Sequence, residues 1–194
     1  MSKLKSEVIK YSKKLNITNL SALRSGNISL RAREKGVDGF YITPSGRKYS
    51  SLKPKDIVFV SLKGIFDKKK GKPSSEWRFH QDIYLSKKEA KAIVHAHSTC
   101  AAAVSSHQKN IPAFHYMIGV AGGEDLKCTK YATFGTKQLS KNIIKALKNR
   151  SACLIANHGQ VAFSSNLEKA FELAQEVENI CHQYINALRI GIPK

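Results

Sequence analysis

The sequence has few cysteines, and they lack the spacing of a disulfide framework or a thiolate metal site. No Cys-x-x-Cys pair occurs, and each cysteine stands alone among apolar or small residues: Cys100, Cys128, Cys153 and Cys181. This arrangement excludes a disulfide-stapled domain and a zinc site built on thiolates. We therefore expect four buried free thiols in a reducing compartment.

Long apolar runs are missing as well. A run such as Ala152–Ala156 is far shorter than the roughly 20 residues that a membrane-spanning helix needs. The first residues, Met1–Lys5, lack the apolar segment of a signal peptide. Because 42 % of the 194 residues are hydrophobic, the chain can still bury a core, which excludes an intrinsically disordered protein. We expect a soluble, cytoplasmic protein with a single domain over residues 1–194.

Acidic residues are scarce. The chain has 14 Asp and Glu against 33 Lys and Arg, which leaves a net charge of +19. Such an excess attracts polyanions, from nucleic acids to small phosphorylated substrates, without choosing between them. The basic residues are scattered apart from the run Lys68–Lys70, and no basic stripe with interleaved aromatics occurs. We therefore do not expect specific binding to nucleic acid.

Periodicity and turn signals predict helices and strands that interleave without internal repeats or linkers. Helices are expected over residues 3–15, from 73 to about 85, over 99–107 and 136–147, and from Asn166 onward. Strands are expected at 28–31, 40–42, 56–60, 64–66, 92–97, 113–118, 131–134, 152–156 and 160–163. Because short turns join several strands, the pattern favours an α/β domain with a mixed, largely antiparallel sheet and helices on both faces.

Histidines supply the first candidate site. His95 and His97 are two residues apart in a predicted strand, so their side chains project from the same face and can meet one metal ion, although such pairs also occur on ordinary surfaces. His158 ends an apolar strand and precedes Gly159, where the backbone can pass close to a ligand. Three imidazoles with a carboxylate or water make an open catalytic zinc site. The histidines without this spacing are interpreted mostly as packing or surface residues: His80, His107, His115 and His182.

Glu76 is the candidate carboxylate. It lies in the first turn of a predicted helix, where its role could also be limited to the helix dipole. The hydroxyls and backbone N–H groups of Ser74 and Ser75, just before it, suit an anion such as phosphate. The turns at Gly26-Asn27 and Ser45-Gly46 offer similar groups. Beside the surplus of basic residues, three such turns indicate a small phosphorylated substrate.

A series of segments along nearly the whole chain resembles the class II, metal-dependent sugar-phosphate aldolases, in the order found in that family. The segments are Ser25–Ser29, Ile42–Gly46, Pro73–His80, Val94–His97, Ile111–Ile118, Ala121–Gly123, Tyr131–Thr136, Asn157–Gly159 and Asn166–Ala170. Those around Glu76 and Tyr116 are similar to the L-fuculose-1-phosphate branch of the family. The resemblance implies a three-layer α-β-α domain.

The resemblance also implies a role for individual residues. His95, His97 and His158 match three zinc ligands, with one zinc ion per subunit. Glu76 matches the acid–base carboxylate, which is also a metal ligand before the substrate arrives, and Tyr116 matches a tyrosine offered to the active site of a neighbouring subunit. The phosphate-binding positions are matched by Asn27, Ser45, Gly46, Ser74 and Ser75. The implied assembly is a homotetramer with active sites at subunit boundaries.

The implied reaction is the reversible cleavage of L-fuculose 1-phosphate, or a closely related ketose 1-phosphate, to dihydroxyacetone phosphate and L-lactaldehyde. It would proceed through a zinc-stabilised enediolate, with Glu76 carrying the proton at C3 and Tyr116 serving the aldehyde oxygen. The resembled enzymes carry a longer C-terminal tail with a second tyrosine that helps close the site, whereas this sequence stops at Lys194.

The sequence leaves alternative functions open. Within the same superfamily they are a pentulose-phosphate aldolase, a 4-epimerase and a methylthioribulose-phosphate dehydratase, which share the three histidines and differ in their products. Outside it, a non-enzymatic basic protein that binds an acidic partner would account for the charge. That last hypothesis leaves the histidines and Glu76 without a role.

Overall fold

The computed structural model describes residues 2–192 of the chain, and its centre is one six-stranded sheet. The strands follow the order β3-β2-β1-β4-β6-β5, and each neighbouring pair runs antiparallel. They are β1 (Asn27–Glu34), β2 (Val37–Ile42), β3 (Val58–Ser61), β4 (Ala92–Ala96), β5 (Ala152–Ile155) and β6 (Gly159–Ser164). Short turns between β1 and β2 and between β5 and β6 impose this antiparallel pairing.

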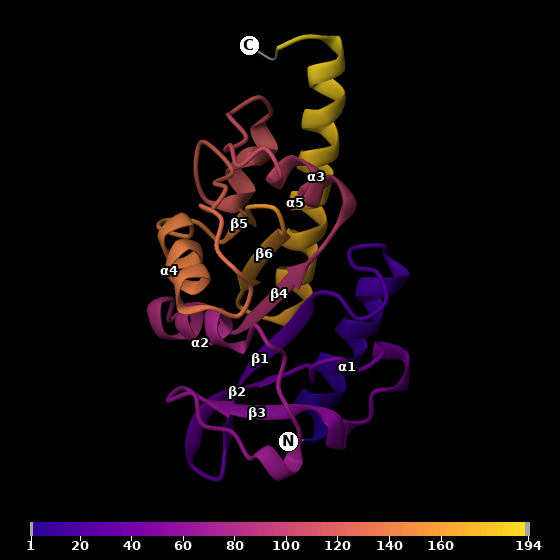
Figure 1. The fold of residues 1–194 in the computed structure, drawn as a ribbon, viewed down its shortest axis with the longest axis vertical. Helices are drawn as coiled ribbons and strands as arrows, with labels where there is room; N and C mark the ends of the chain where they lie inside the picture. The colour runs from indigo at the N-terminus through magenta and orange to yellow at the C-terminus, as the bar shows by residue number, and fades with distance from the viewer. Residues whose placement is uncertain (1, 193–194) are drawn as a thin grey trace.

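Helices cover both faces of the sheet, so the predicted three-layer arrangement is confirmed (Figure 1). The α-helices are α1 (Ser2–Ile17), α2 (Trp77–Ser86), α3 (Thr99–Ser105), α4 (Lys137–Ala146) and α5 (Leu167–Ile190). Helices α1, α3 and α5 pack on one face around one apolar cluster, and α2 and α4 pack on the other face around a second. Strand β4 is buried throughout, and Val94 and Ile93 point into different clusters because side chains alternate along a strand. No helix in the described residues is both long and apolar enough to cross a membrane.

Two helix starts agree with the sequence-based expectation. The side chain of Thr136 accepts a hydrogen bond from the backbone N–H of Leu139 and caps α4, and Asn166 caps α5 by accepting from Lys169. The helix expected from residue 73 begins only at Trp77, which leaves Ser74 and the residues after it in a turn ahead of the helix. This later start places the serines at the edge of a cavity rather than on a helix surface.

Three predicted strands are absent from the structure. Residues 64–66 follow a turn and have no regular structure, and neither do residues 131–134, whose two aromatic side chains are exposed. The segment 113–118 leads into the 3-10 helix η4 (Tyr116–Ala121), where His115 caps the first turn. Aromatic and branched residues raised the strand propensity in all three segments, but no described strand pairs with 113–118 or 131–134. Ile65 has only a local contact with Ser61 at the end of β3, where the backbone N–H of Ser61 donates to the carbonyl oxygen of Ile65 at 2.9 Å.

The cysteines are all free, and burial separates them into two pairs. Cys153 and Cys181 are buried in the core, whereas Cys100 and Cys128 are only half-buried. The expectation of four buried thiols is therefore wrong for two of them. Burial raises the pKa of Cys128 to about 11, so even this half-buried group stays a thiol at neutral pH.

Candidate active site

Three histidines meet at the end of the central strands. His95 lies on β4, His97 follows directly after that strand, and His158 lies in the turn between β5 and β6. Nε2 of His97 is 2.9 Å from Nε2 of His95 and 2.9 Å from Nε2 of His158. The turn is tight because Gly159 lies against β4, where a Cβ atom would come within 2.3 Å of the carbonyl oxygen of Ala96. Residues 61 positions apart in sequence are thus brought into contact.

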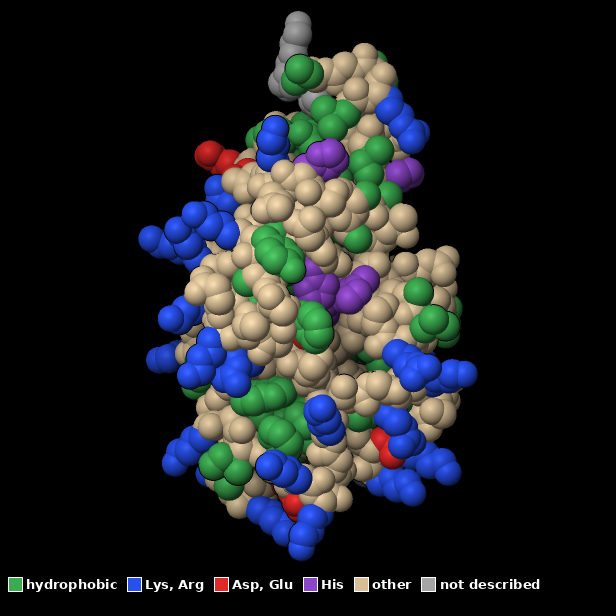
Figure 2. All heavy atoms as spheres, in the orientation of Figure 1, with side chains coloured by type: hydrophobic (Ala, Val, Ile, Leu, Met, Phe, Trp, Pro, Cys, Tyr) green, Lys and Arg blue, Asp and Glu red, His purple; other side chains and the backbone are tan. Residues whose placement is uncertain are grey.

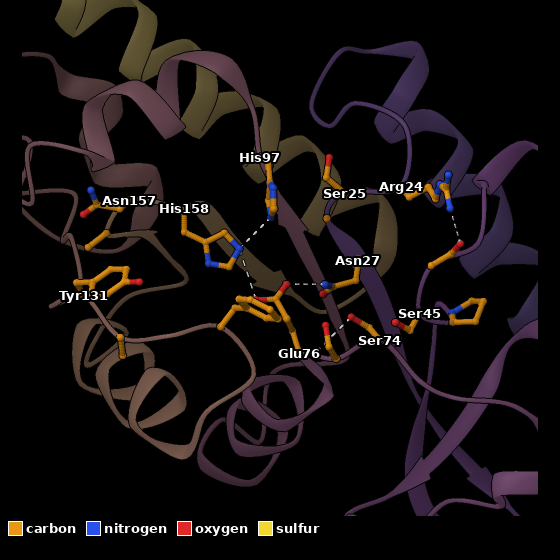
Figure 3. A pocket seen from close by; sticks show the side chains of 17 residues that line it. Arg24, Ser25, Asn27, Ser45, Ser74, Glu76, His97, Tyr131, Asn157 and His158 are labelled. Carbon is orange, nitrogen blue, oxygen red and sulfur yellow. Dashed lines mark hydrogen bonds and ion pairs between the residues drawn. The ribbon is translucent and has the colours of Figure 1, made fainter.

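The carboxylate of Glu76 completes this group. Its Oε2 lies 3.1 Å from Nε2 of His95, and its Oε1 lies 3.5 Å from Nε2 of His158. One ligand atom from each of the four residues lies within 4.8 Å of the others. Figure 3 shows His97, His158 and Glu76 pointing toward one another at the centre of the cavity. The structure therefore assembles the four residues that the sequence analysis proposed as metal ligands.

The charges of this cluster follow from burial and mutual contact. Burial, with the nearby His95, lowers the pKa of His97 to about 3 and that of His158 to about 4, so both rings are neutral. Burial also opposes charge on His95 and Glu76, yet their mutual attraction prevails, raising the pKa of His95 and lowering that of Glu76. The Nδ1 of His95 donates to the carbonyl oxygen of Gln160 at 2.7 Å. Its Nε2 is therefore the nitrogen that faces the cluster.

This donor set fits a divalent cation. Three imidazole nitrogens and one carboxylate are the ligand types that first-row divalent metals such as zinc prefer. The backbone bond to His95 orients that ring, as hydrogen bonds behind metal-bound histidines commonly do. Oε1 of Glu76 is buried and accepts no hydrogen bond from the described residues. A buried carboxylate oxygen without a partner is costly, and a cation or a substrate proton would satisfy it.

Two turns form the side of the cavity next to the cluster. The turn at Ser45 and the turn at Ser74 are joined by a β-bridge between Pro44 and Pro73. The backbone N–H groups of Ser45 and Ser74 donate to carbonyl oxygens within this bridge, at 3.0 Å each, so they are not the free amides that the sequence suggested. The hydroxyls of both serines instead face the cavity (Figure 3), where Ser75 and Gly46 also lie.

Asn27 and Gly26 lie at the bottom of the same cavity. Asn27 is buried, and its side-chain Nδ2 donates to Oε2 of Glu76 at 3.0 Å. Gly26 has a φ of +76°, and a Cβ atom there would lie 2.6 Å from the carbonyl oxygen of His95. A residue with a side chain would be both strained and too close to β4. Glycine therefore allows the turn before β1 to pass beside the histidines.

The cavity has a volume of about 440 Å³, a size suited to a small substrate, and includes residues that sequence reasoning missed. Arg24 lines it and donates to the carbonyl oxygen of Gly46 at 3.2 Å. In Figure 3, Arg24 and Ser45 lie on one side of the histidines, and Tyr131 and Asn157 lie on the other. Arg24 could not be singled out among 33 scattered basic residues. Figure 2 shows histidine side chains in a hollow near the middle of this face, with Lys and Arg side chains spread around it.

Tyr116 is not brought to this cavity. It lies on η4, its side chain is 84 % exposed, and it is not among the described residues that line the cavity of its own chain. Its ring packs beside that of His115, with 4.7 Å between the ring centroids. A role for Tyr116 in catalysis therefore requires a second chain.

Comparison with known proteins identifies the family to which this fold and the Glu-His-His-His cluster belong. A family model described as Class II Aldolase and Adducin N-terminal domain matches residues 6–185. The L-fuculose phosphate aldolase of Escherichia coli (strain K12) is 43 % identical over 192 residues, covering 99 % of this chain and 87 % of that protein. The 5-methylthioribulose-1-phosphate/5-deoxyribulose-1-phosphate aldolase of Rhodospirillum rubrum is 40 % identical over 191 residues, covering 98 % of this chain and 84 % of that protein.

A solved structure agrees with these sequence relatives. An L-fuculose 1-phosphate aldolase superposes with a TM-score of 0.93 at 41 % identity, covering 100 % of this chain and 90 % of that one. The chain belongs to the class II aldolase family. It is an aldehyde-lyase with a Glu-His-His-His cluster, and the hypothesis of a non-enzymatic basic protein is set aside.

Proposed function

We propose that the protein cleaves L-fuculose 1-phosphate, or a closely related ketose 1-phosphate, reversibly to dihydroxyacetone phosphate and an aldehyde, which is L-lactaldehyde for the first substrate. The observation that carries this proposal is the clustering of Glu76 with the three histidines beside two serine-containing turns. It is supported by relatives named for that reaction at 43 % identity. We also propose a cytoplasmic enzyme of fucose metabolism.

The metal in this proposal is zinc, one ion per subunit, held by His95, His97, His158 and, before substrate binds, Glu76. A bound zinc ion would supply Lewis-acid stabilisation of the negative charge that develops on the substrate oxygens. The protein itself holds the ligands in place through the backbone contact behind His95 and the tight turn at His158.

Glu76 carries the proton in this proposal. When the C3–C4 bond of the ketose breaks, the three-carbon fragment retains the electron pair and needs a proton at C3. In the direction of synthesis the ionised Glu76 removes this proton from C3, and in cleavage it returns it. The proton that C3 gains in cleavage is balanced by the proton that the C4 hydroxyl loses as the aldehyde forms. The carboxylate is buried, faces the cluster and has one oxygen without a hydrogen bond, which suits a group that must exchange a proton with the substrate.

The substrate phosphate binds on the side of the cavity formed by the two bridged turns. The hydroxyls of Ser45, Ser74 and Ser75 and the backbone of Gly46 are the binding groups, with Asn27 at the bottom of the cavity. Arg24 adds a guanidinium beside Gly46. Guanidinium groups form strong charge-assisted hydrogen bonds with phosphate oxygens. This side of the cavity therefore fixes C1 of the ketose, while the remaining carbons extend across the histidines.

Tyr116 acts in the active site of a neighbouring subunit within a homotetramer. Its exposure and its distance from the cavity of its own chain are consistent with this role. It would donate a proton to, or take one from, the aldehyde oxygen.

A second substrate class is supported by the relatives named for 5-methylthioribulose 1-phosphate and 5-deoxyribulose 1-phosphate, at 40 % identity. These ketoses and L-fuculose 1-phosphate share carbons C1 to C3, and each yields dihydroxyacetone phosphate when the C3–C4 bond breaks. They differ only in the aldehyde fragment. The residues of the metal and phosphate sites would thus act in the same way on all three.

The test measures release of dihydroxyacetone phosphate from each of the three ketose phosphates by a coupled NADH assay. We expect release that EDTA abolishes and added zinc restores, and the ratio of kcat/KM values identifies the preferred aldehyde. Failure to release dihydroxyacetone phosphate, from protein shown to contain zinc, would contradict an aldolase acting on these substrates. Product analysis would then distinguish an epimerase from a dehydratase.

A further inference from the structure

A chain of buried polar side chains extends from Glu76 into the layer between the sheet and α2. It passes through Asn27 and Ser29 of β1 and through His80 and Tyr84 of α2. The exposed fractions of these four residues are 2 %, 0 %, 0 % and 2 %. The ring of His80 is stacked on that of Phe79, with 4.6 Å between centroids, so its orientation is restricted by packing. A buried polar chain of this kind is stable only if each member has its partner.

Consecutive members of the chain are within hydrogen-bond distance. Nδ2 of Asn27 is 3.0 Å from Oε2 of Glu76, and Oδ1 of Asn27 is 2.5 Å from Nε2 of His80. Nδ1 of His80 is 2.7 Å from the hydroxyl of Ser29, which is 2.8 Å from the hydroxyl of Tyr84. Four contacts therefore connect a tyrosine beneath the sheet to the carboxylate in the cavity.

The orientation of the Asn27 amide determines the direction of each hydrogen bond. Nδ2 of Asn27 donates to Oε2 of Glu76, so the amide oxygen of Asn27 faces His80 and must accept there. Nε2 of His80 must then carry the hydrogen, and Nδ1 must accept from the Ser29 hydroxyl. That hydroxyl oxygen in turn accepts from Tyr84. Burial lowers the pKa of His80 to about 3, which agrees with the neutral ring that this pattern requires.

We propose that His80 is a positioning residue of the aldolase reaction: through Asn27 it fixes Oε2 of Glu76 and leaves Oε1 as the oxygen that exchanges the proton with the substrate. This inference rests on the proposed function. Oε2 lies within hydrogen-bond distance of Asn27 and His95, whereas Oε1 is buried without a hydrogen bond, and its polar neighbour Nε2 of His158 is 3.5 Å away. A carboxylate oxygen that accepts no hydrogen bond is the more basic of the two. Without the His80 donor, Asn27 could turn its oxygen toward Glu76 and displace the carboxylate.

The principal test replaces His80 and follows proton exchange. His80→Leu removes the donor, whereas His80→Gln places an amide N–H near the former Nε2. The exchange of the C3 hydrogen of dihydroxyacetone phosphate with D2O, observed by NMR, reports the Glu76 step without any aldehyde. We expect His80→Leu to lower both this exchange and kcat by about 10- to 100-fold, with little change in KM or in metal content. His80→Gln should recover most of the loss, and His182→Leu, at an exposed histidine, is the control.

A second measurement does not depend on turnover or on a variant that folds. Long-range 1H–15N spectra of the wild-type protein labelled at histidine distinguish a ring with hydrogen on Nε2 from one with hydrogen on Nδ1. We expect His80 to carry its hydrogen on Nε2. Hydrogen on Nδ1, or His80→Leu exchanging at the wild-type rate, would overturn the proposal. If the wild-type protein neither exchanges nor cleaves, the proposed function fails, and the spectrum still decides whether the hydrogen-bond network is oriented as inferred.

Discussion

At the scale of single residues, the two oxygens of Glu76 are not equivalent. One oxygen contacts Asn27 and His95, and the other accepts no hydrogen bond from the described residues. The position of Glu76, directly ahead of α2, sets this environment because the carboxylate points into the cavity instead of capping its own helix. The sequence left open that Glu76 only interacts with the helix dipole. Its contacts with Asn27 and His95 do not fit that role.

Substitution of Glu76 by Gln should separate metal binding from proton transfer. The amide has nearly the same shape as the carboxylate but cannot accept and return a proton. We expect kcat for ketose cleavage to fall by about 10² to 10⁴-fold, while the three histidines keep most of the metal. Turnover is measured by the coupled assay and metal content by mass spectrometry. Full turnover in Glu76→Gln would contradict the proposed role, and Glu172→Gln on the exposed side of α5 serves as the matched control.

Arg24 should affect substrate binding more than chemistry. Its guanidinium lies beside Gly46 at the phosphate side of the cavity and is remote from the proton that Glu76 carries. We expect Arg24→Ala to raise KM for the ketose phosphate, and the inhibition constant of inorganic phosphate, by about tenfold with a smaller change in kcat. Arg33→Ala removes an exposed arginine of β1 and is the control. Equal phosphate inhibition of Arg24→Ala and wild-type protein would exclude this contact.

At the scale of elements, the histidines depend on how α3 is attached to the core. Strand β4 ends beside His97, and α3 begins at Thr99, so movement of this helix would move the ligand. The carboxylate of Glu178, on α5, accepts from the backbone N–H groups of Cys100 and Ala101 at 2.7 and 2.8 Å. A carboxylate at the start of a helix satisfies amides that have no partner inside the helix.

Loss of that carboxylate should weaken both the fold and the site. We expect Glu178→Ala to lower the free energy of unfolding by about 1 to 2 kcal/mol, because two N–H groups lose a charged acceptor. Metal affinity should fall as well, since His97 is attached to the same segment. Urea denaturation and metal titration measure the two effects. Glu176→Ala removes a carboxylate from the same helix that accepts a hydrogen bond from the side chain of Asn179, and it should change neither quantity.

At the scale of the whole molecule, the proposed role of the exposed Tyr116 depends on how the subunits assemble. One chain supplies Glu76 in a cavity, whereas its Tyr116 is exposed to solvent and is not among the described residues that line that cavity. If neighbouring subunits share active sites, the two residues act together only between chains. Two inactive variants can then complement each other.

Mixing the variants tests this arrangement. We expect homo-oligomers of Glu76→Gln and of Tyr116→Phe to have low activity. After joint unfolding and refolding, about a quarter of the sites in a random mixture would combine an intact Glu76 with an intact Tyr116. Activity should therefore recover toward about a quarter of the wild-type value. Hybrids verified by differently tagged chains that stay as inactive as their parents would contradict a shared site.

Much of the fold could be predicted from the sequence because local signals agreed with the tertiary structure. The caps at Thr136 and Asn166 marked two helix starts, and alternating or apolar runs marked the central strands. The predicted strands failed at 113–118 and 131–134, where the side chains have strand propensity but no partner strand lies beside them. Strand pairing is a long-range property that a local pattern cannot contain.

What the sequence by itself determined is the chemistry available: neighbouring histidines at His95 and His97, a carboxylate at Glu76 ahead of a helix, and turns with serine hydroxyls. What only the tertiary structure decided is which groups meet. The folded structure brings His158 into contact with His97, and it places Arg24, one of many basic residues, beside Gly46. It also places His80, which the sequence analysis interpreted as a packing residue, in the hydrogen-bond network behind Glu76. The physical reason is that burial and hydrogen bonding between residues far apart along the chain arise only when β1, β4, β6 and α2 pack together.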